Sequence, residues 1–238
     1  MNAATREQLC RQAVVDKRRL GLGLEDVRRI DDFFQRECGI VSPLPLPAWM
    51  RKLRQLAGRN FAATYQSVHD EYASFIQAGE DVPLLLQNQF YDVLADKRIA
   101  GHVHSQKRTE ILDAGCFLLY LVRLLQITGP ILDVGCHTGH HAIMLARETG
   151  GPIRGIDLST KAIAAAQTEA RGAANVTFST DPLSTPDFSE MFELVYAVRS
   201  IDLNQESAAL VAAALKPGGI AVFFPHAPPV FEIGRAHV

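Results

Sequence analysis

The residues best placed for chemistry lie in one short glycine-containing segment. Gly135 follows Asp133 by two residues and Gly139 follows Gly135 by four, in a segment that starts with the apolar run Ile131–Val134. Glycine adopts backbone angles that a side chain forbids, so it lets a ligand approach the main chain closely. The first turn of a helix that follows such a loop also exposes unpaired amides. The segment therefore predicts a ligand-binding loop between a strand and a helix.

The spacing of the glycines bears on the class of ligand. Dinucleotide-binding folds carry the pattern G-x-G-x-x-G, which lets a pyrophosphate rest on the helix N-terminus. Here the second and third glycine positions are His137 and His140. A bulky side chain at position 137 obstructs close packing of a pyrophosphate, which argues against a nicotinamide-dependent oxidoreductase.

Two acidic residues follow later apolar runs. Asp157 lies about twenty residues beyond the loop, where an acidic side chain can accept hydrogen bonds from both hydroxyls of a ribose. It is also placed to cap a helix that begins near Ser159. Asp181 precedes Pro182 and is equally suited to a turn.

The elements that position these residues follow from hydrophobic periodicity. The sequence predicts strands at 131–134, 152–156, 176–179, 192–198 and 220–224, and helices at 139–148, 159–171 and 205–215. Alternating strands and helices imply right-handed crossovers and a parallel sheet that is covered on both faces. We expect an α/β fold with a doubly wound, mostly parallel sheet and its ligand at the carboxyl ends of the strands.

The first 127 residues show no strand pattern. Apolar residues recur at helical spacing in 24–34 and 61–76, and breaks are expected at 42–47, 79–83 and 101–105. The segment Ile111–Cys116 nearly repeats the start of the glycine loop, but its apolar positions continue at helical spacing, so we expect a buried helix. Residues 1–127 are predicted to be an all-helical cap, substrate-binding or dimerisation region.

The order of these signals resembles the class I S-adenosylmethionine-dependent methyltransferases. Asp133, Gly135 and Gly139 match the family pattern Asp/Glu-x-Gly-x-Gly-x-Gly, with His137 in place of the middle glycine. The stretch Leu215–Ile220 has the Leu-Lys-Pro-Gly-Gly spelling that is common before the fifth strand of these enzymes. The resemblance covers about residues 128–225 and implies a Rossmann-like methyltransferase domain over 128–231.

The resemblance implies that S-adenosylmethionine is the cofactor. The loop would wrap around the methionine part of the cofactor. Asp157 would accept hydrogen bonds from the ribose hydroxyls, and Asp181 would contact the adenine amino group. The implied cofactor-binding residues are Asp133, Gly135, Cys136, His137, Gly139, Asp157, Leu158, Asp181, Pro182 and Ala197. Family members often place substrate or catalytic residues after the fourth strand, where this chain has Arg199, Ser200 and Asp202. No general base is identified.

The predicted function is methyl transfer to a small-molecule acceptor. An RNA or protein methyltransferase and a non-catalytic S-adenosylmethionine-binding protein are the alternatives, the latter because of His137. A net charge of −2 gives no general attraction to nucleic acid or to an anionic membrane, although nucleic acid is not excluded. A homodimer through the helical region is a further expectation.

The histidines and cysteines indicate whether the protein binds a metal and in which cellular compartment it is found. His137, His140 and His141 are predicted to have loop or surface roles and no metal, because adjacent helical residues point in different directions. The four cysteines form no CxxC pair, and the polar start is no secretory leader, so we expect a cytoplasmic protein.

The end of the chain departs from the family pattern. Methyltransferases of this class continue past the fifth strand into a reversed pair of strands. The last residues, Glu232–Val238, resemble a translated sequencing adapter, and we predict a non-native tail there and a truncated domain. Truncation would leave the edge of the sheet unpaired.

Overall fold

The structure is a computed structural model that describes residues 24–40, 46–96, 99–100, 104, 108–201, 204–224 and 232–235. Helices fill the described part of the first half, and no strand precedes residue 131 there. This confirms the predicted helical N-terminal region. No helix in the described residues is both long and apolar enough to cross a membrane. The first-half elements are α2 (Leu24–Asp32), the π-helix η1 (Phe33–Glu37), α3 (Leu46–Ala57), α4 (Arg59–Ala78), α5 (Leu84–Leu94) and α7 (Arg108–Leu124).

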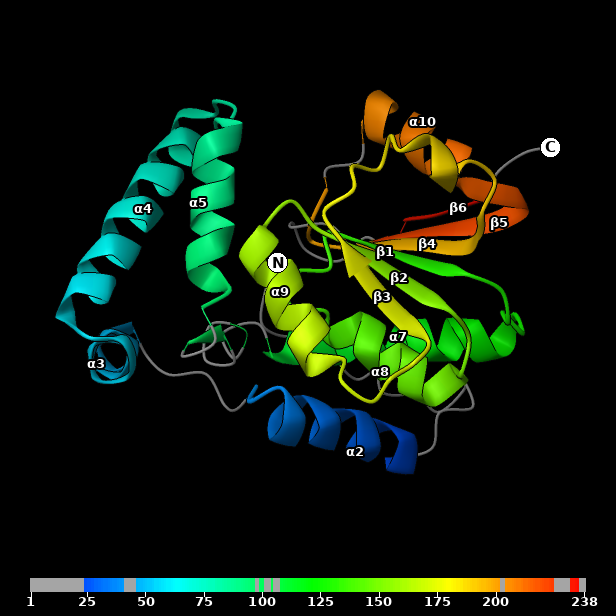
Figure 1. Ribbon diagram of the computed structural model, residues 1–238, viewed down its shortest axis with the longest axis horizontal. Coiled ribbons are helices and arrows are strands. Elements are labelled where there is room, and N and C mark those ends of the chain that lie inside the picture. Colours follow the sequence, from blue (N-terminus) through cyan, green and yellow to red (C-terminus); the bar gives the residue numbers. More distant parts are fainter. Residues whose placement is uncertain are drawn as a thin grey trace, which may run out of the picture.

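The second half is an α/β sheet (Figure 1). Its strands run in the order β3-β2-β1-β4-β5-β6, with the first five parallel and β6 antiparallel to β5. This confirms the doubly wound, mostly parallel fold, and the strand order reverses between β1 and β4. The elements are β1 (Ile131–Val134), α8 (His140–Thr149), β2 (Ile153–Ile156), α9 (Thr160–Glu169), β3 (Val176–Ser179), the 3-10 helix η2 (Pro186–Phe188), β4 (Phe192–Val198), α10 (Gln205–Ala214), β5 (Leu215–Phe224) and β6 (Glu232–Arg235).

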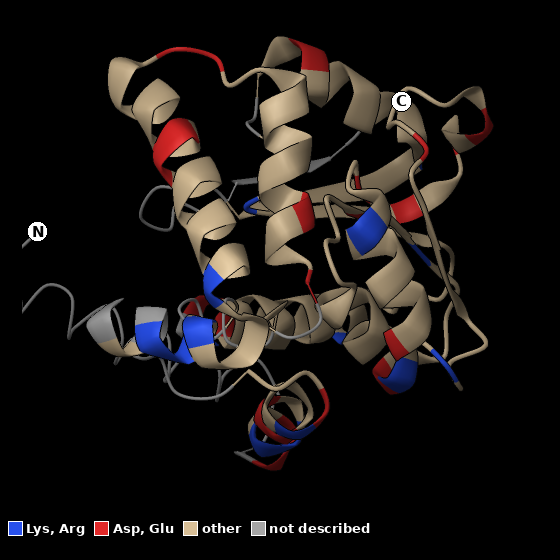
Figure 2. Ribbon diagram, turned by 60° about the vertical axis from the view of Figure 1, so that its left-hand side comes forward, with Lys and Arg blue, Asp and Glu red and all other residues tan. Residues whose placement is uncertain are grey.

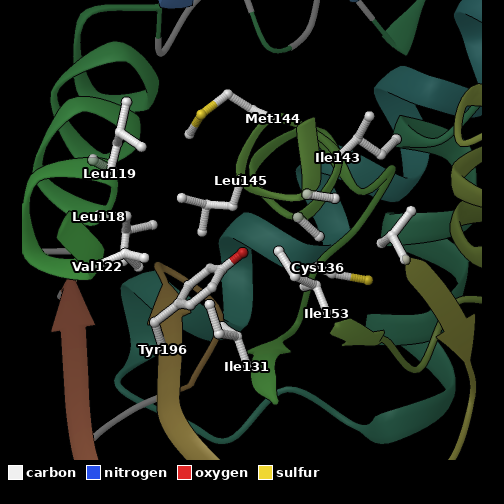
Figure 3. Close-up of a cluster of buried hydrophobic side chains, with 14 of the residues drawn as sticks. Leu118, Leu119, Val122, Ile131, Cys136, Ile143, Met144, Leu145, Ile153 and Tyr196 are labelled. Atoms are coloured by element: carbon white, nitrogen blue, oxygen red, sulfur yellow. The ribbon is translucent and has the colours of Figure 1, made fainter. Parts of the chain in front are cut away.

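Both faces of the sheet are buried, as parallel strands require. On one face, Ile131 and Tyr196 pack against Leu118 of α7 and Leu145 of α8 (Figure 3). On the other face, a second cluster joins β-strand side chains to α10 and η2, and it includes Val134. The four residues of β1 are all buried, which explains why its sequence reads as a continuous apolar run broken only by an aspartate.

The segment Ile111–Cys116 lies in α7, as predicted. Cys116 is fully buried in the core. A Cβ added at Gly115 would lie 3.0 Å from the Phe34 ring of η1, so a small residue is needed where α7 meets η1. The near-repeat of the glycine loop is therefore a packing feature and no second loop.

The helices α4 and α5 form a hairpin that stands beside the sheet (Figure 1). The predicted break at 79–83 separates them: Gly79 ends α4 in a left-handed conformation with φ 69°, and α5 begins after Pro83. The hairpin contacts α3 at its base and α9 through α5. Most of the break at 42–47 lies outside the described residues, and Pro47 falls in the first turn of α3, where its missing amide is tolerated.

Two predictions about the end of the sheet are wrong. The Pro-Gly-Gly segment was expected to precede the fifth strand, but β5 begins at Leu215, and the extra residues form an irregularity opposite β4. Residues 232–235 pair with 220–223 of β5, so the β5 edge is not left unpaired. An edge strand offers free N–H and C=O groups, which an extended segment of almost any sequence can satisfy. Whether 232–238 is native stays a prediction.

Candidate functional site

The glycine loop follows β1 at the carboxyl edge of the sheet. Gly135, His137 and Gly139 all adopt left-handed backbone angles, with φ of 68°, 49° and 77°. Glycine adopts this conformation without strain, whereas a residue with a side chain pays roughly 1–2 kcal/mol. The alternation of left-handed residues gives the physical reason for glycine at alternate positions, and His137 is the position where this chain accepts the strain.

Both glycines are also required by space. A Cβ added at Gly135 would lie 2.1 Å from the Cβ of Ser200, and one at Gly139 would lie 2.6 Å from the Cζ of Phe178. Ser200, which follows β4, also donates a hydrogen bond from Oγ to the carbonyl of Val134. Side chains from β3 and from the end of β4 therefore pack so closely on the loop that only glycine fits at these two positions.

Asp157 joins the loop to the start of α9. Its Oδ2 accepts a hydrogen bond from the amide of His137 at 2.8 Å, and its Oδ1 accepts one from the amide of Ser159 at 2.9 Å. The helix N-cap is Ser159, whose Oγ accepts from the amide of Ala162 at 3.0 Å, so Asp157 is not the cap. A carboxylate has about four acceptor sites, which leaves Asp157 capacity for further donors.

Sequence reasoning missed Asp92, a residue of the helical region that bonds to Ser159 beside this carboxylate. Ser159 Oγ donates to Asp92 Oδ1 of α5 at 2.6 Å, and Lys161 Nζ lies 3.4 Å from Asp92 Oδ2. The α4–α5 hairpin is thereby bonded to the residues that hold Asp157. Asp92 sits inside an ordinary helical pattern, and no local signal distinguishes it from a solvated side chain.

Asp133 lies inside the core behind the loop. Burial raises its pKa to about 7, and the negative charge of Asp157 adds to the rise, while the nearby Tyr196 hydroxyl and the Ala142 amide of α8 oppose it. The Tyr196 hydroxyl lies beside Asp133 without the geometry of a full hydrogen bond. Asp133 thus links the end of β1 to the first turn of α8, on either side of the loop.

A cluster of imidazoles covers the middle of the loop. His104 Nε2 lies 3.0 Å from His137 Nδ1, and the Thr138 hydroxyl bridges His104 at 3.3 Å and His140 Nε2 at 3.1 Å. Burial, followed by the neighbouring histidines, lowers the pKa of His104 well below its ordinary value. Burial lowers the pKa of His140 to about 3. The cluster is therefore neutral at physiological pH and joins His104 to the loop.

The predicted loop or surface roles are wrong for His140 and His141. His140 is only 7% exposed, and His141 donates from Nε2 to the Ile111 carbonyl of α7 at 3.0 Å. The first turn of α8 packs under α7, which the local sequence does not reveal. Within the described residues, no group of three or more His, Cys, Asp or Glu side chains has the geometry to hold a metal.

Three further predicted residues lie at or behind the loop. Cys136 continues the sheet, since its amide donates to the Ile156 carbonyl at 2.9 Å, and burial raises the pKa of its thiol well above the ordinary value. It is therefore a poor nucleophile. Leu158, next to Asp157, is 52% exposed. The Ala197 side chain points into the core beside Val134, its register partner.

Asp181 is held at the end of β3. Its Oδ2 accepts a hydrogen bond from Arg154 Nη2 of β2 at 2.6 Å. Hydrogen bonding from Ser179 and then from Arg154 lowers the pKa of this carboxyl. The Arg154 guanidinium also lies 4.7 Å from the centre of the Phe188 ring. The structure thus ties Asp181, and with it the adjoining Pro182, to β2 rather than to the glycine loop, and Arg154 is a partner that the sequence analysis did not name.

The residues after β4 form the far side of the site. The Arg199 guanidinium pairs with Glu110 in the first turn of α7, and the Arg199 amide donates to the Phe224 carbonyl at 2.8 Å. Ser200 contacts the glycine loop, as described above. Asp202 lies outside the described residues. The ion pair joins β4 to α7, a partnership that sequence spacing does not reveal.

Comparison with known proteins agrees with this geometry. The sequence model of the methyltransferase domain family matches residues 131–219, which span β1 to the bulge of β5. No curated protein matches the chain.

Solved structures that resemble the chain include several methyltransferases. CalS10, an amino pentose methyltransferase of Micromonospora echinaspora with bound S-adenosylmethionine, is 26% identical over 49% of this chain and 51% of its own, with a TM-score of 0.41. Phosphoethanolamine N-methyltransferase 2 of Haemonchus contortus is 27% identical over 43% of this chain and 26% of its own, with a TM-score of 0.39. YJHP of E. coli is 27% identical over 45% of this chain and 50% of its own, with a TM-score of 0.38.

The chain spans about half, or less, of the length of these structures. Their TM-scores are all low, so the family assignment rests on the matched sequence segment and on the geometry of the loop. The strand order, the glycine loop at the point where it reverses, and the acidic residue after β2 all lie in that segment. Residues 131–219 of this chain thus match the methyltransferase domain family.

Proposed function

We propose that this protein is an S-adenosylmethionine-dependent methyltransferase that acts on a small-molecule acceptor. The observation that carries the proposal is the left-handed glycine loop at the β1–β4 switch, with the Asp157 carboxylate bonded to its central amide. Ligands of open α/β sheets bind at this point of the fold. The family match over residues 131–219 supports the same activity.

The donor and acceptor groups of the site fit this cofactor. The remaining acceptor sites of Asp157 suit the two ribose hydroxyls, and the exposed Leu158 side chain offers an apolar contact beside them. Asp181 would accept from the adenine amino group, in exchange for part of its bond to Arg154. The backbone of Gly135–Gly139 would lie along the methionine part. We propose the cofactor-binding set Asp133, Gly135, Cys136, His137, Gly139, Asp157, Leu158, Asp181, Pro182 and Ala197, with Asp133 and Ala197 acting from behind the loop.

When bound, the cofactor supplies an electrophilic methyl group, and the protein supplies alignment and proximity. The chain's own residues must hold the loop rigid and exclude water. Asp157 does so through its bond to the His137 amide, and Ser200 does so from the end of β4. We assign no general base.

A small-molecule acceptor fits the charge of the site better than RNA does. At the carboxyl edge of the sheet, Lys161 and Arg199 are already paired with Asp92 and Glu110, and the Asp157 carboxylate forms no salt bridge within the described residues. A phosphate backbone is bound by Lys and Arg, and carboxylates repel it. The amino pentose and phosphoethanolamine enzymes among the similar structures act on small molecules, as their names state. We propose that the reaction takes place in the cytoplasm.

Calorimetry with S-adenosylmethionine and S-adenosylhomocysteine tests the cofactor assignment, with NADH as the comparison ligand. We expect micromolar binding of the first two, and at least tenfold weaker binding in Asp157→Ala, which is about 1.4 kcal/mol. The matched control is Asp187→Ala, an exposed aspartate in η2, which should bind as the wild type does. A folded protein that binds neither methyl-donor ligand refutes the proposal.

One observation favours a second candidate, a non-catalytic S-adenosylmethionine-binding protein. His137 carries a side chain where the family has glycine, and its Nε2 is buried without a hydrogen-bond partner. Incubation with S-adenosylmethionine labelled in its methyl group and a panel of amine, hydroxyl and carboxylate acceptors separates the two candidates. Binding without transfer to any acceptor, together with turnover regained in His137→Gly, would favour the non-catalytic protein.

A further inference from the structure

The α3–α4–α5 unit has opposite charges at its two ends. Along α3 and α4, basic side chains lie at the base and acidic ones lie toward the opposite end, as Figure 2 shows, whereas α5 carries the acidic Asp92 nearer the base, where it pairs with Lys161. We call these the basic end and the acidic end. The basic end consists of Arg51, Lys52, Arg54 and Arg59, and the acidic end of Glu71, Glu80 and Asp81.

These charges have no partners within the described part of the chain. None of the seven side chains forms a salt bridge there, although ion pairs are frequent elsewhere, such as Arg29 with Glu148 and Arg123 with Asp26. Charges of one sign gathered at one end and left unpaired within the described fold are available to a partner with the opposite arrangement.

Apolar side chains accompany the acidic end. Ile76, Leu84 and Leu85 are 59%, 60% and 71% exposed, and they lie at the close of α4 and the start of α5. They account for half of the large apolar side chains that are exposed in the described residues. Exposed apolar groups that gather on one part of a surface are typical of a protein-contact site.

The hairpin face is large enough for a specific contact. A helix of 20 residues such as α4 is roughly 30 Å long, and two adjacent helices are about 20 Å wide. A face of that size covers on the order of 600 Å², near the ~800 Å² per partner of a standard interface. The basic and acidic ends are separated by most of the length of α4.

We propose that the α4–α5 hairpin docks antiparallel on the hairpin of a second copy of this chain. A twofold axis across the middle of α4 would set the basic end of each copy on the acidic end of the other. Such an interface is self-complementary, because the same patch serves both subunits. A nucleic acid or an anionic membrane would be attracted by one end and repelled by the other, so a second copy with reversed direction fits both ends at once.

The test is the mass of the full-length protein in solution, by sedimentation velocity or light scattering. We expect a dimer whose dissociation constant rises with added salt, because exposed charges are screened. Two variants reverse one end each. Arg51→Glu, Arg54→Glu and Arg59→Glu together give the basic end a net negative charge, and Glu80→Arg with Asp81→Arg gives the acidic end a net positive charge, so each variant should self-associate at least tenfold more weakly.

The decisive measurement mixes the two variants in equal amounts. Both contacts between a hairpin with two net-negative ends and a hairpin with two net-positive ends are favourable, so the mixture should form a heterodimer while neither variant dimerises alone. The matched control is Arg171→Glu, an exposed reversal beyond α9, which should leave the dimer unchanged. Circular dichroism and thermal unfolding of each variant verify folding. A monomeric wild type, a dimer insensitive to both reversals, or a mixture that stays monomeric overturns the proposal, whatever the cofactor experiment shows.

Discussion

Replacing the buried Asp133 with asparagine should stabilise the protein at alkaline pH. Burial raises the pKa of this carboxyl to about 7 from an ordinary 3.8. The folded state therefore holds the proton more tightly than the unfolded chain does. The contribution of Asp133 to stability is fully present below pH 3.8 and is lost as the pH rises to 7. Asparagine has nearly the same shape and no charge at any pH.

The size of the effect follows from the shift. A rise of about three pKa units corresponds to roughly 4 kcal/mol of stability lost between the two values, as an upper limit. About 1.5 kcal/mol of this stabilisation is already lost at pH 5. The wild type therefore loses roughly 2–3 kcal/mol more between pH 5 and pH 8. The stability of Asp133→Asn relative to the wild type should therefore rise by that amount over this interval.

Guanidinium unfolding of both proteins at pH 5 and pH 8, followed by circular dichroism, measures the change. The buried histidines also alter stability with pH, but they are the same in both proteins and cancel in the difference. The reasoning about Asp133 is refuted if the difference in unfolding free energy between variant and wild type is the same at the two pH values.

Three other substitutions test the loop and the packing behind it. His137→Gly should be more stable than His137→Ala by about 1 kcal/mol in chemical denaturation, because both remove the imidazole and only glycine suits φ 49°; equal stabilities would contradict the strain argument. Gly155→Ala should destabilise the protein by roughly 1–3 kcal/mol, because the added Cβ would lie 2.5 Å from the Phe178 ring, and a wild-type melting temperature would disprove it. Burial lowers the pKa of His140 to about 3 from 6.5, so its contribution to stability is lost as the pH falls below 6.5. His140→Asn should thus lose about 2 kcal/mol less than the wild type between pH 6.5 and pH 5, and parallel acid-unfolding curves would count against a neutral buried imidazole.

Local periodicity by itself determined the architecture. The strands at 176–179 and 192–198 have the bounds that the sequence predicts, and α7 lies where its apolar spacing places it. These features depend on neighbouring residues, since a buried parallel strand needs a short apolar run and a helix needs apolar positions three and four apart. The position of the glycine loop is local in the same sense, because it is fixed by the strand before it and the helix after it.

Contacts between segments far apart in the chain were decided only by the tertiary structure. The hydrogen bond from Ser159 to Asp92 spans 67 positions, and the contact of His104 with His137 spans 33. The hydrogen bond of His141 depends on where α7 packs, and the need for glycine at 135 depends on Ser200. Such contacts arise when strands pair in the sheet and helices pack on it. The residues that make them follow no periodic pattern in the sequence, so the sequence alone does not reveal the contacts.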